Sequence, residues 1–112
     1  MIHLKIKPLS VNEAWQGRRF KTDKYKKFEK DVLYLLPKIK LPEPPYAIFY
    51  EFGFSNKLSD FDNPIKMIND ILQKKYLFND NQIYEAHIKK VIVKKGEEYI
   101  KINIETIKEC IP

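Results

Sequence analysis

The segment Tyr46–Phe54 constrains the fold more than any other part of this chain, because its pattern predicts a strand in the interior of a sheet. Aromatic and β-branched residues favour strands, and apolar residues on both faces are typical of a strand that is buried on both sides. One face carries a continuous series of large apolar side chains, Tyr46, Ile48, Tyr50, Phe52 and Phe54. We therefore predict a central strand, and interpret its aromatic side chains as core rather than as a platform for stacking bases.

Three more segments have the alternation of half-buried strands. Apolar and polar residues alternate over residues 2–6, and again over residues 83–95 and 98–105. Gly96 turns the chain between the last two segments, as in a hairpin. Residues 9–21 have no clear period and are predicted to form a loop.

Two segments have the spacing of amphipathic helices. The first runs from Asp23, its predicted cap, to Leu36, with its apolar positions at Tyr25, Phe28, Val32, Leu35 and Leu36. The second opens at Pro64, with Asp62 or Asn63 as its cap, and frays near Lys75. Its buried positions are predicted to be Ile65, Ile68, Ile71 and Leu72. The predicted fold is α+β, with a mixed sheet of about four strands and two main helices in two layers, forming one domain over residues 1–112.

The net charge of +6 is unevenly distributed along the chain. Residues 1–40 contain 11 Lys/Arg and 4 Asp/Glu, residues 41–88 contain 4 and 7, and residues 89–112 contain 6 and 4. Basic segments thus flank an acidic centre, whose carboxylates would repel phosphate unless a cation lay between them. This distribution indicates nucleic acid and metal as partners. The composition is that of a soluble intracellular protein with no membrane span, and the single cysteine, Cys110, excludes an internal disulfide.

The segment 59–70 holds the residues that point most directly to chemistry. Asp60 and Asp62 are two positions apart in chain that is predicted to be extended, so their side chains can point the same way. Lys66 and Asp70 follow at steps of four and share a face of the predicted helix. Asp80 lies on a polar turn after that helix, and a chain doubling back there would bring it beside the aspartate pair.

Converging carboxylates raise each other's pKa, and Mg²⁺ or Mn²⁺ relieves this repulsion because both ions prefer oxygen ligands. Such an ion activates water and stabilises a leaving oxygen, while a neighbouring lysine neutralises charge on a phosphate. Each residue alone also has an ordinary interpretation, as a helix cap, a solvated loop residue or a surface ion pair. The pattern indicates a metal site only when these residues are taken together.

At these positions the chain resembles the RusA family of Holliday junction resolvases. Three separate motifs carry the resemblance, in the family's order: Pro8, Ser10-Val11-Asn12, Trp15 and Arg18-Arg19; then Asp60-Phe61-Asp62-Asn63 with Lys66 and Asp70; then Asp80-Asn81-Gln82-Ile83. The family often has two adjacent acids in the last motif. Here Asn79 precedes Asp80, which leaves Asp80 as the one acidic residue of that turn.

The resemblance implies a homodimeric, Mg²⁺- or Mn²⁺-dependent endonuclease that makes paired nicks in four-way DNA junctions. Asp60, Asp62 and Asp80 would be the metal ligands, and Lys66 would act near the scissile phosphate. Asp70 would orient Lys66, with Asn12 and Asn63 in supporting positions. The resemblance also implies a cytoplasmic protein encoded by a bacterium or a phage.

The basic N-terminal region is the predicted DNA contact. Phosphate contacts are expected from Arg18, Arg19, Lys21, Lys24 and Lys27, although such residues also form ordinary solvated faces. Trp15 either stacks at the junction centre or packs across the dimer. Three other functions remain open at this point. They are a DNA-binding protein for branched or single-stranded DNA without catalysis, a metal nuclease acting on flaps or RNA, and a small basic interaction domain.

Overall fold

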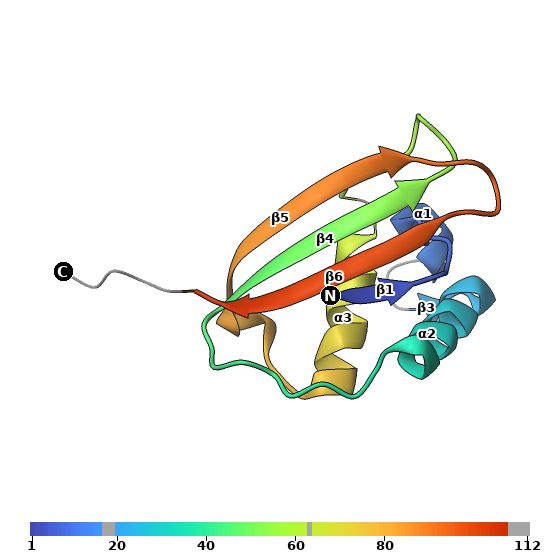
Figure 1. Ribbon diagram of the computed structural model, residues 1–112. Helices are drawn as coiled ribbons and strands as arrows, with labels where there is room; N and C mark the ends of the chain where they lie inside the picture. Colours follow the sequence, from blue (N-terminus) through green and yellow to red (C-terminus); the bar gives the residue numbers. More distant parts are fainter. Residues whose placement is uncertain (17–19, 63, 108–112) are drawn as a thin grey trace.

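Strand β4 (Tyr46–Phe54) lies in the interior of a four-stranded sheet, as its sequence predicted. The computed structural model describes residues 1–16, 20–62 and 64–107 (Figure 1). Strand β4 pairs in parallel with β5 (Ile83–Ile92) and in antiparallel with β6 (Tyr99–Thr106). Strand β1 (Ile2–Leu4) pairs with the other side of β6, which gives the order β1-β6-β4-β5. The sheet is therefore mixed, with β1 and β5 at its edges.

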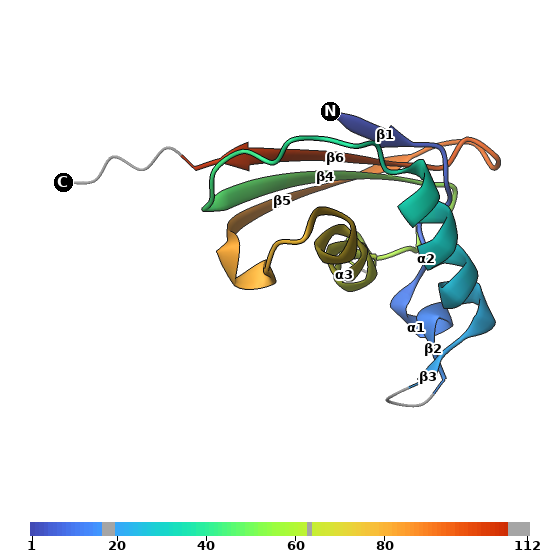
Figure 2. The same ribbon diagram turned by 90° about the horizontal axis from the view of Figure 1, so that it is seen from below.

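Helices α2 (Asp23–Leu35) and α3 (Ile65–Tyr76) cover one face of this sheet (Figure 2). The core lies between the two layers and combines the inward face of β4 with the buried stripes of both helices. Its fully buried larger side chains include Tyr25, Val32, Ile48, Phe52, Met67, Ile68, Ile71, Leu72 and Ile100. The predicted two-layer α+β fold with a mixed sheet and two main helices is confirmed. No helix in the described ranges has both the length and the apolar character needed to cross a membrane.

Both helix starts differ from the prediction. Thr22, not Asp23, caps α2, and its hydroxyl accepts a hydrogen bond from the Tyr25 backbone N–H at 3.2 Å. Pro64 occupies the cap position of α3 without any side-chain cap, so Asp62 does not serve as the predicted cap. The fixed φ of proline favours the helical backbone there without a capping side chain.

The helical stripes are also shifted slightly from those predicted. Leu35 is exposed and Leu36 is buried, because α2 ends at Leu35 and Leu36 leaves the helix in an extended conformation. In α3 the buried set includes Met67 in addition to the predicted residues, while Ile65 is only half-buried. The wider stripe fits a helix that contacts α2 and also packs beneath the sheet, as Figure 2 shows.

Residues 9–21 are not simply a loop. They contain the short helix α1 (Val11–Ala14) and the short strands β2 (Trp15–Gln16) and β3 (Phe20–Lys21), which pair in antiparallel. The Thr22 backbone N–H donates to the Ala14 carbonyl at 2.9 Å. Elements of two to four residues are too short to produce a hydrophobic period, so the sequence carried no signal for them.

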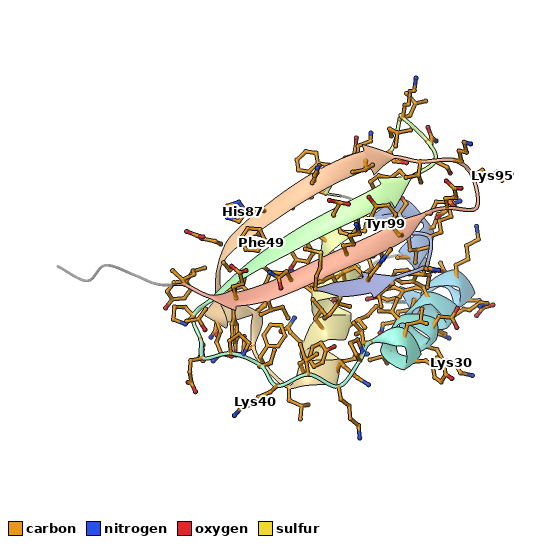
Figure 3. All side chains as sticks on the ribbon, viewed as in Figure 1. Lys30, Lys40, Phe49, His87, Lys95 and Tyr99 are labelled. Atoms are coloured by element: carbon orange, nitrogen blue, oxygen red, sulfur yellow. The ribbon has the colours of Figure 1, made fainter. Side chains whose placement is uncertain are left out.

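The second face of β4 is open, which corrects the prediction that the strand is buried on both faces. Phe49 is 36% exposed and stacks on His87 of β5, with ring centroids 4.7 Å apart. Figure 3 shows Phe49, His87 and Tyr99 on this uncovered face of the sheet. Gly53 lies so close beneath the Tyr99 ring that a Cβ at residue 53 would be only 2.5 Å from two of the ring carbons. The open face is thus lined by aromatic rings and charged side chains rather than by a second layer.

The predicted turn at Gly96 is present, and its φ of 94° requires glycine. The strands on either side of it are not paired with each other, however, because β5 and β6 lie on opposite sides of β4. A hairpin signal identifies a reversal of the chain, but a third strand can still insert between the two arms. Strand β4 does this here and takes one neighbour on each side.

Candidate active site

The loop after β4 carries Asp60 and is fixed by contacts from two directions. Within the loop, the Asn56 side chain accepts from the Leu58 backbone N–H at 2.9 Å, and the Asn56 carbonyl accepts from Ser59 N–H at 3.2 Å. From β5, the Lys90 ammonium donates to the backbone carbonyls of Lys57, at 2.7 Å, and of Ser59. Lys90 was not predicted as a site residue. Its only signal in the sequence was a lysine that interrupts the apolar positions Ile88 and Ile92 on one face of the strand.

Asp60 and Asp62 both have exposed side chains in this region. The chain at residues 61–62 is a turn rather than the extended segment that was predicted, and the Asp62 carbonyl accepts from Ile65 N–H at 3.1 Å. Neither carboxylate forms a hydrogen bond or an ion pair with another described residue. Since Asp62 does not cap α3 either, no structural role in the described part of the chain accounts for these two acids.

Lys66 and Asp70 lie on α3, one and two turns beyond this loop. Lys66 is exposed and Asp70 is half-buried, and no ion pair joins them. The charge of Asp70 instead acts on Tyr25 of α2. Burial, together with the negative charges of Asp70 and Glu29, raises the pKa of the Tyr25 hydroxyl to about 12. Asp70 therefore lies toward α2, while Lys66 is exposed in the first turn of α3.

Asp80 is held at the opposite end of α3. It begins the short 3₁₀ helix η1 (Asp80–Gln82), which Asn79 caps through a reciprocal capping box with Gln82. The Asp80 backbone N–H donates to the Gln73 side-chain oxygen at 3.0 Å, while the Asp80 side chain is exposed. The twelve residues of α3 span about 18 Å. Asp80 is therefore separated from Asp62 by about the length of this helix.

The topology explains this separation. Strands β4 and β5 are parallel, so the chain must return to the starting end of the sheet between them, and α3 makes that return. Asp60 and Asp62 follow the carboxyl end of β4, whereas Asp80 precedes the amino end of β5. Across the described residues, no three Asp, Glu, His or Cys side chains are grouped closely enough to hold a metal ion. A single chain thus brings Asp60, Asp62 and Lys66 to one end of α3, and Asp80 to the other.

A polar hollow of about 280 Å³ adjoins the Asp60 loop. Pro8 and Ser10 line it on one side, and Ser55 and Ser59 on another. The structure therefore places Pro8 and Ser10 of the first motif beside the loop that leads into the second, although the two are about 50 residues apart in sequence. The side chains of Asn12 and Trp15 and the whole of Arg18, Arg19 and Asn63 lie outside the part of the chain that the structure describes.

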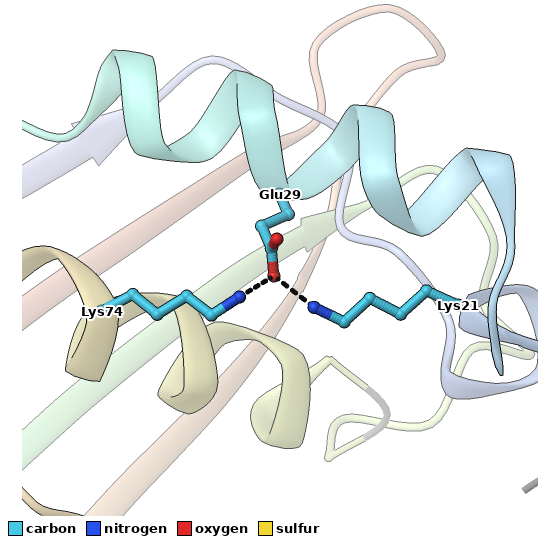
Figure 4. A network of polar contacts seen from close by, with 3 residues as sticks. All are labelled: Lys21, Glu29 and Lys74. Atoms are coloured by element: carbon cyan, nitrogen blue, oxygen red, sulfur yellow. Dashed lines mark hydrogen bonds and ion pairs between the residues drawn. The ribbon is translucent and has the colours of Figure 1, made fainter. Parts of the chain in front are cut away.

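The predicted DNA-contacting lysines each have an acidic partner within the chain. Lys27 lies 2.7 Å from Asp31, and Lys24 lies 3.7 Å from Glu13. Lys21 and Lys74 of α3 both contact one oxygen of Glu29, each at 2.9 Å (Figure 4). Glu29 was not predicted from the sequence, and it ties α2 to both β3 and α3.

The Glu29 bridge makes stability depend on pH. Burial raises the pKa of the Glu29 carboxyl, but hydrogen bonds from Lys21 and Lys74, together with their charges, outweigh burial and bring it below its ordinary value of 4.5. A carboxyl with a lowered pKa stabilises the fold above its unfolded-state pKa, and that contribution is lost as the pH falls through the folded-state value.

We expect Glu29→Gln to cost about 1.5–3 kcal/mol at pH 7 and to flatten the loss of stability below pH 4.5. Urea denaturation at several pH values measures this, with Glu43→Gln, an exposed glutamate, as control. Parallel curves for wild type and Glu29→Gln would contradict it.

The comparison with known families gives the remaining evidence. Residues 7–105 match the family model described as Endodeoxyribonuclease RusA, which includes every candidate residue discussed above. No curated protein matched the chain significantly in a direct search. The family match covers all three motifs. The chain belongs to the RusA family of endodeoxyribonucleases.

Proposed function

We propose that this protein is a Mg²⁺- or Mn²⁺-dependent endonuclease that resolves four-way DNA junctions by paired nicks during recombination and repair. The observation that carries the proposal is that Asp60 and Asp62, just before α3, and Lys66, in its first turn, are all exposed in a member of a family of endodeoxyribonucleases. A protein that only bound DNA would gain nothing from acids facing phosphate. Its site of action is the cytoplasm of a bacterium or of a phage-infected cell.

The complete acidic site requires two copies of the chain. Asp80 is about one helix length from Asp62 in a single protomer, so an Asp80 that joins Asp60 and Asp62 must come from a partner. A two-fold homodimer would form two such sites, each with two aspartates from one protomer and one from the other. This arrangement suits a four-way junction, which presents two equivalent strands for cutting.

The donor set fits a hard divalent cation. Carboxylate oxygens are the protein ligands that Mg²⁺ and Mn²⁺ prefer, and Asp60, Asp62 and Asp80 are all exposed and without acidic or basic partners in the described ranges. When bound, such an ion supplies Lewis acidity toward phosphate oxygen and water. The Lys66 ammonium neutralises negative charge that develops on the scissile phosphate. Arg18, Arg19, Lys21, Lys24 and Lys27 bind flanking phosphates, with Asn12, Asn63, Asp70 and Trp15 in supporting positions.

Cleavage of a synthetic four-way junction tests this function. We expect wild-type protein to make paired, symmetric nicks with Mg²⁺ or Mn²⁺, and Asp62→Asn to cut about a thousand-fold more slowly while still binding the junction. The size follows from removing one charged ligand from the ion, worth about 4 kcal/mol. Linear duplex and single strands serve as substrate controls. Asp23→Asn, which removes an exposed aspartate at the start of α2, is the matched control variant.

Calorimetric titration with Mn²⁺ gives a readout independent of activity, and should show weaker binding by Asp62→Asn than by Asp23→Asn. Tight junction binding without cleavage under either ion would overturn the enzyme and leave a structure-specific DNA-binding protein. Faster cleavage of flaps or RNA than of junctions would overturn the proposed substrate while retaining the metal site.

A further inference from the structure

Lys90 of β5 is a charged residue on the face of the sheet that the helices cover. It lies opposite Phe52 of β4 in the parallel register of the two strands, and Phe52 is fully buried on that face. The Lys90 side chain is half-buried, and its ammonium lies 5.9 Å from the centroid of the Phe54 ring. A charge in such surroundings is costly unless polar groups compensate it. The position of Lys90 therefore depends on what its ammonium contacts.

The contacts of this ammonium are two backbone carbonyls in the loop that follows β4. The carbonyls belong to Lys57 and Ser59, and the loop lies beside the carboxyl end of β5 (Figure 1). The start of the same loop is held separately, because the Ser55 hydroxyl donates to the Glu98 carboxylate at 2.8 Å. The loop is thus attached to its surroundings at both ends, and Lys90 makes the attachment at the end nearer the acidic residues.

The contact with Ser59 also fixes the residue that follows it. A peptide unit is planar, so the Ser59 carbonyl lies in one plane with the backbone N–H and Cα of Asp60. Orienting this carbonyl therefore orients the Asp60 backbone. Asp62 is held from the other side, because its carbonyl accepts from the Ile65 N–H of α3 at 3.1 Å. The separation of the two carboxylates thus depends on one contact with β5 and one with α3.

We propose that Lys90 is a positioning residue, which sets the Asp60 carboxylate relative to Asp62 by fixing the Ser59–Asp60 peptide to β5. The inference rests on the proposed function, in which these carboxylates bind a divalent ion. Two ligands that are already held at a suitable separation bind an ion more tightly, because ordering them during binding costs free energy. Residues that orient metal ligands typically contribute about 10- to 100-fold to metal affinity or activity.

The variant Lys90→Met tests this role. Methionine keeps an unbranched stem and removes both hydrogen bonds, and its apolar character suits a position between Ile88 and Ile92 on the same face. We expect Mn²⁺ to bind about 10- to 100-fold more weakly in calorimetric titration. Junction cleavage at limiting Mn²⁺ should slow by a similar factor, and excess Mn²⁺ should restore most of the rate because the ligands remain. Affinity for the four-way junction should stay within about three-fold of wild type, since Lys90 does not contact DNA in this proposal.

The loop gives a second readout that needs neither metal nor DNA. The backbone N–H groups of Leu58 and Ser59 both donate to Asn56, so their protection from hydrogen exchange reports how firmly this part of the loop is held. In metal-free Lys90→Met these two amides should exchange about ten-fold faster than in wild type. The amides of β4 should keep their protection, which shows that the variant is folded. Hydrogen exchange followed by NMR measures both.

Two further variants separate the hydrogen bonds from the charge. Lys89→Met is the matched control, because Lys89 is an exposed lysine next in the chain but on the opposite face of β5. It removes the same charge without touching the loop, and should leave Mn²⁺ affinity and loop exchange unchanged. Lys90→Arg keeps a charged group with enough donors for two carbonyls, and should bind Mn²⁺ within about five-fold of wild type.

The outcomes distinguish this role from the proposed function. Unchanged Mn²⁺ affinity in Lys90→Met would overturn the positioning role, and so would an equal loss of affinity in Lys89→Met. Weaker junction binding with unchanged Mn²⁺ affinity would also overturn it and make Lys90 a phosphate contact. Wild-type protein that cleaves junctions no faster than Lys90→Met at limiting Mn²⁺ would overturn the role and leave the function intact. Mn²⁺ binding and loop exchange that depend on Lys90, in a wild-type protein that cuts no junction, would support the role and overturn the function.

Discussion

Mixing the variants Asp62→Asn and Asp80→Asn is expected to restore junction cleavage that neither variant shows alone. Each homodimer lacks one ligand in both of its sites and should cut about a thousand-fold more slowly than wild type. In a heterodimer, however, one site receives Asp60 and Asp62 from the Asp80→Asn chain and Asp80 from the Asp62→Asn chain. About a quarter of all sites in an equilibrated equimolar mixture would therefore be complete. The measurement is nicking of a labelled four-way junction.

The product distinguishes this result from simple residual activity. Each heterodimer would have only one complete site, so the mixture should make single nicks, whereas the wild type should make paired nicks. Mixing Asp60→Asn with Asp62→Asn is the matched control, because both of these residues belong to the same half of the site and no heterodimer contains a complete set. Recovery in this control, or none in the Asp62→Asn and Asp80→Asn mixture, would show that the site is not shared between protomers.

The largest expected effect on stability comes from Phe52→Ala, which should lower the free energy of unfolding by about 3–5 kcal/mol. Phe52 is fully buried on the inward face of β4 and lies between Tyr50 and Phe54, with ring centroids 6.0 and 6.1 Å away. Truncation removes its buried apolar area and leaves a cavity beneath both helices. Urea denaturation at a fixed protein concentration measures the change.

Phe49→Ala is the matched control, because it makes the same substitution three residues earlier in the same strand. Phe49 is partly exposed on the open face and stacks on His87, so its truncation should cost no more than about 1.5 kcal/mol. Equal losses for the two variants would contradict the assignment of the helix-covered face as the core and of the other face as open.

Local patterns in the sequence determined most of the elements. Alternation identified β1, β5 and β6, a run of aromatic and apolar residues identified β4, and helical spacing identified α2 and α3. Side-chain periodicity carries this information because it follows directly from backbone geometry. The sequence also predicted the site residues; the family match spans all of them, and their individual roles stay predictions. The prediction missed features that are very short or that depend on contacts with neighbouring residues. These are the caps of both helices and the elements α1, β2 and β3.

Only the tertiary structure decided how these elements combine. Asp80 follows Asp62 closely in sequence, and a chain that doubles back would bring them together, but the parallel pairing of β4 and β5 makes α3 carry Asp80 to the far end of the sheet. The ion pairs of two basic residues also depend on the tertiary structure. Lys21 of β3 pairs with Glu29 of α2, and Lys24 of α2 pairs with Glu13 of α1, whereas Lys27 pairs with Asp31 one turn along the same helix. Periodicity reports which face of an element is buried, whereas the distance between two side chains depends on strand order and direction. These are set by packing across the whole chain, which no short segment of sequence encodes.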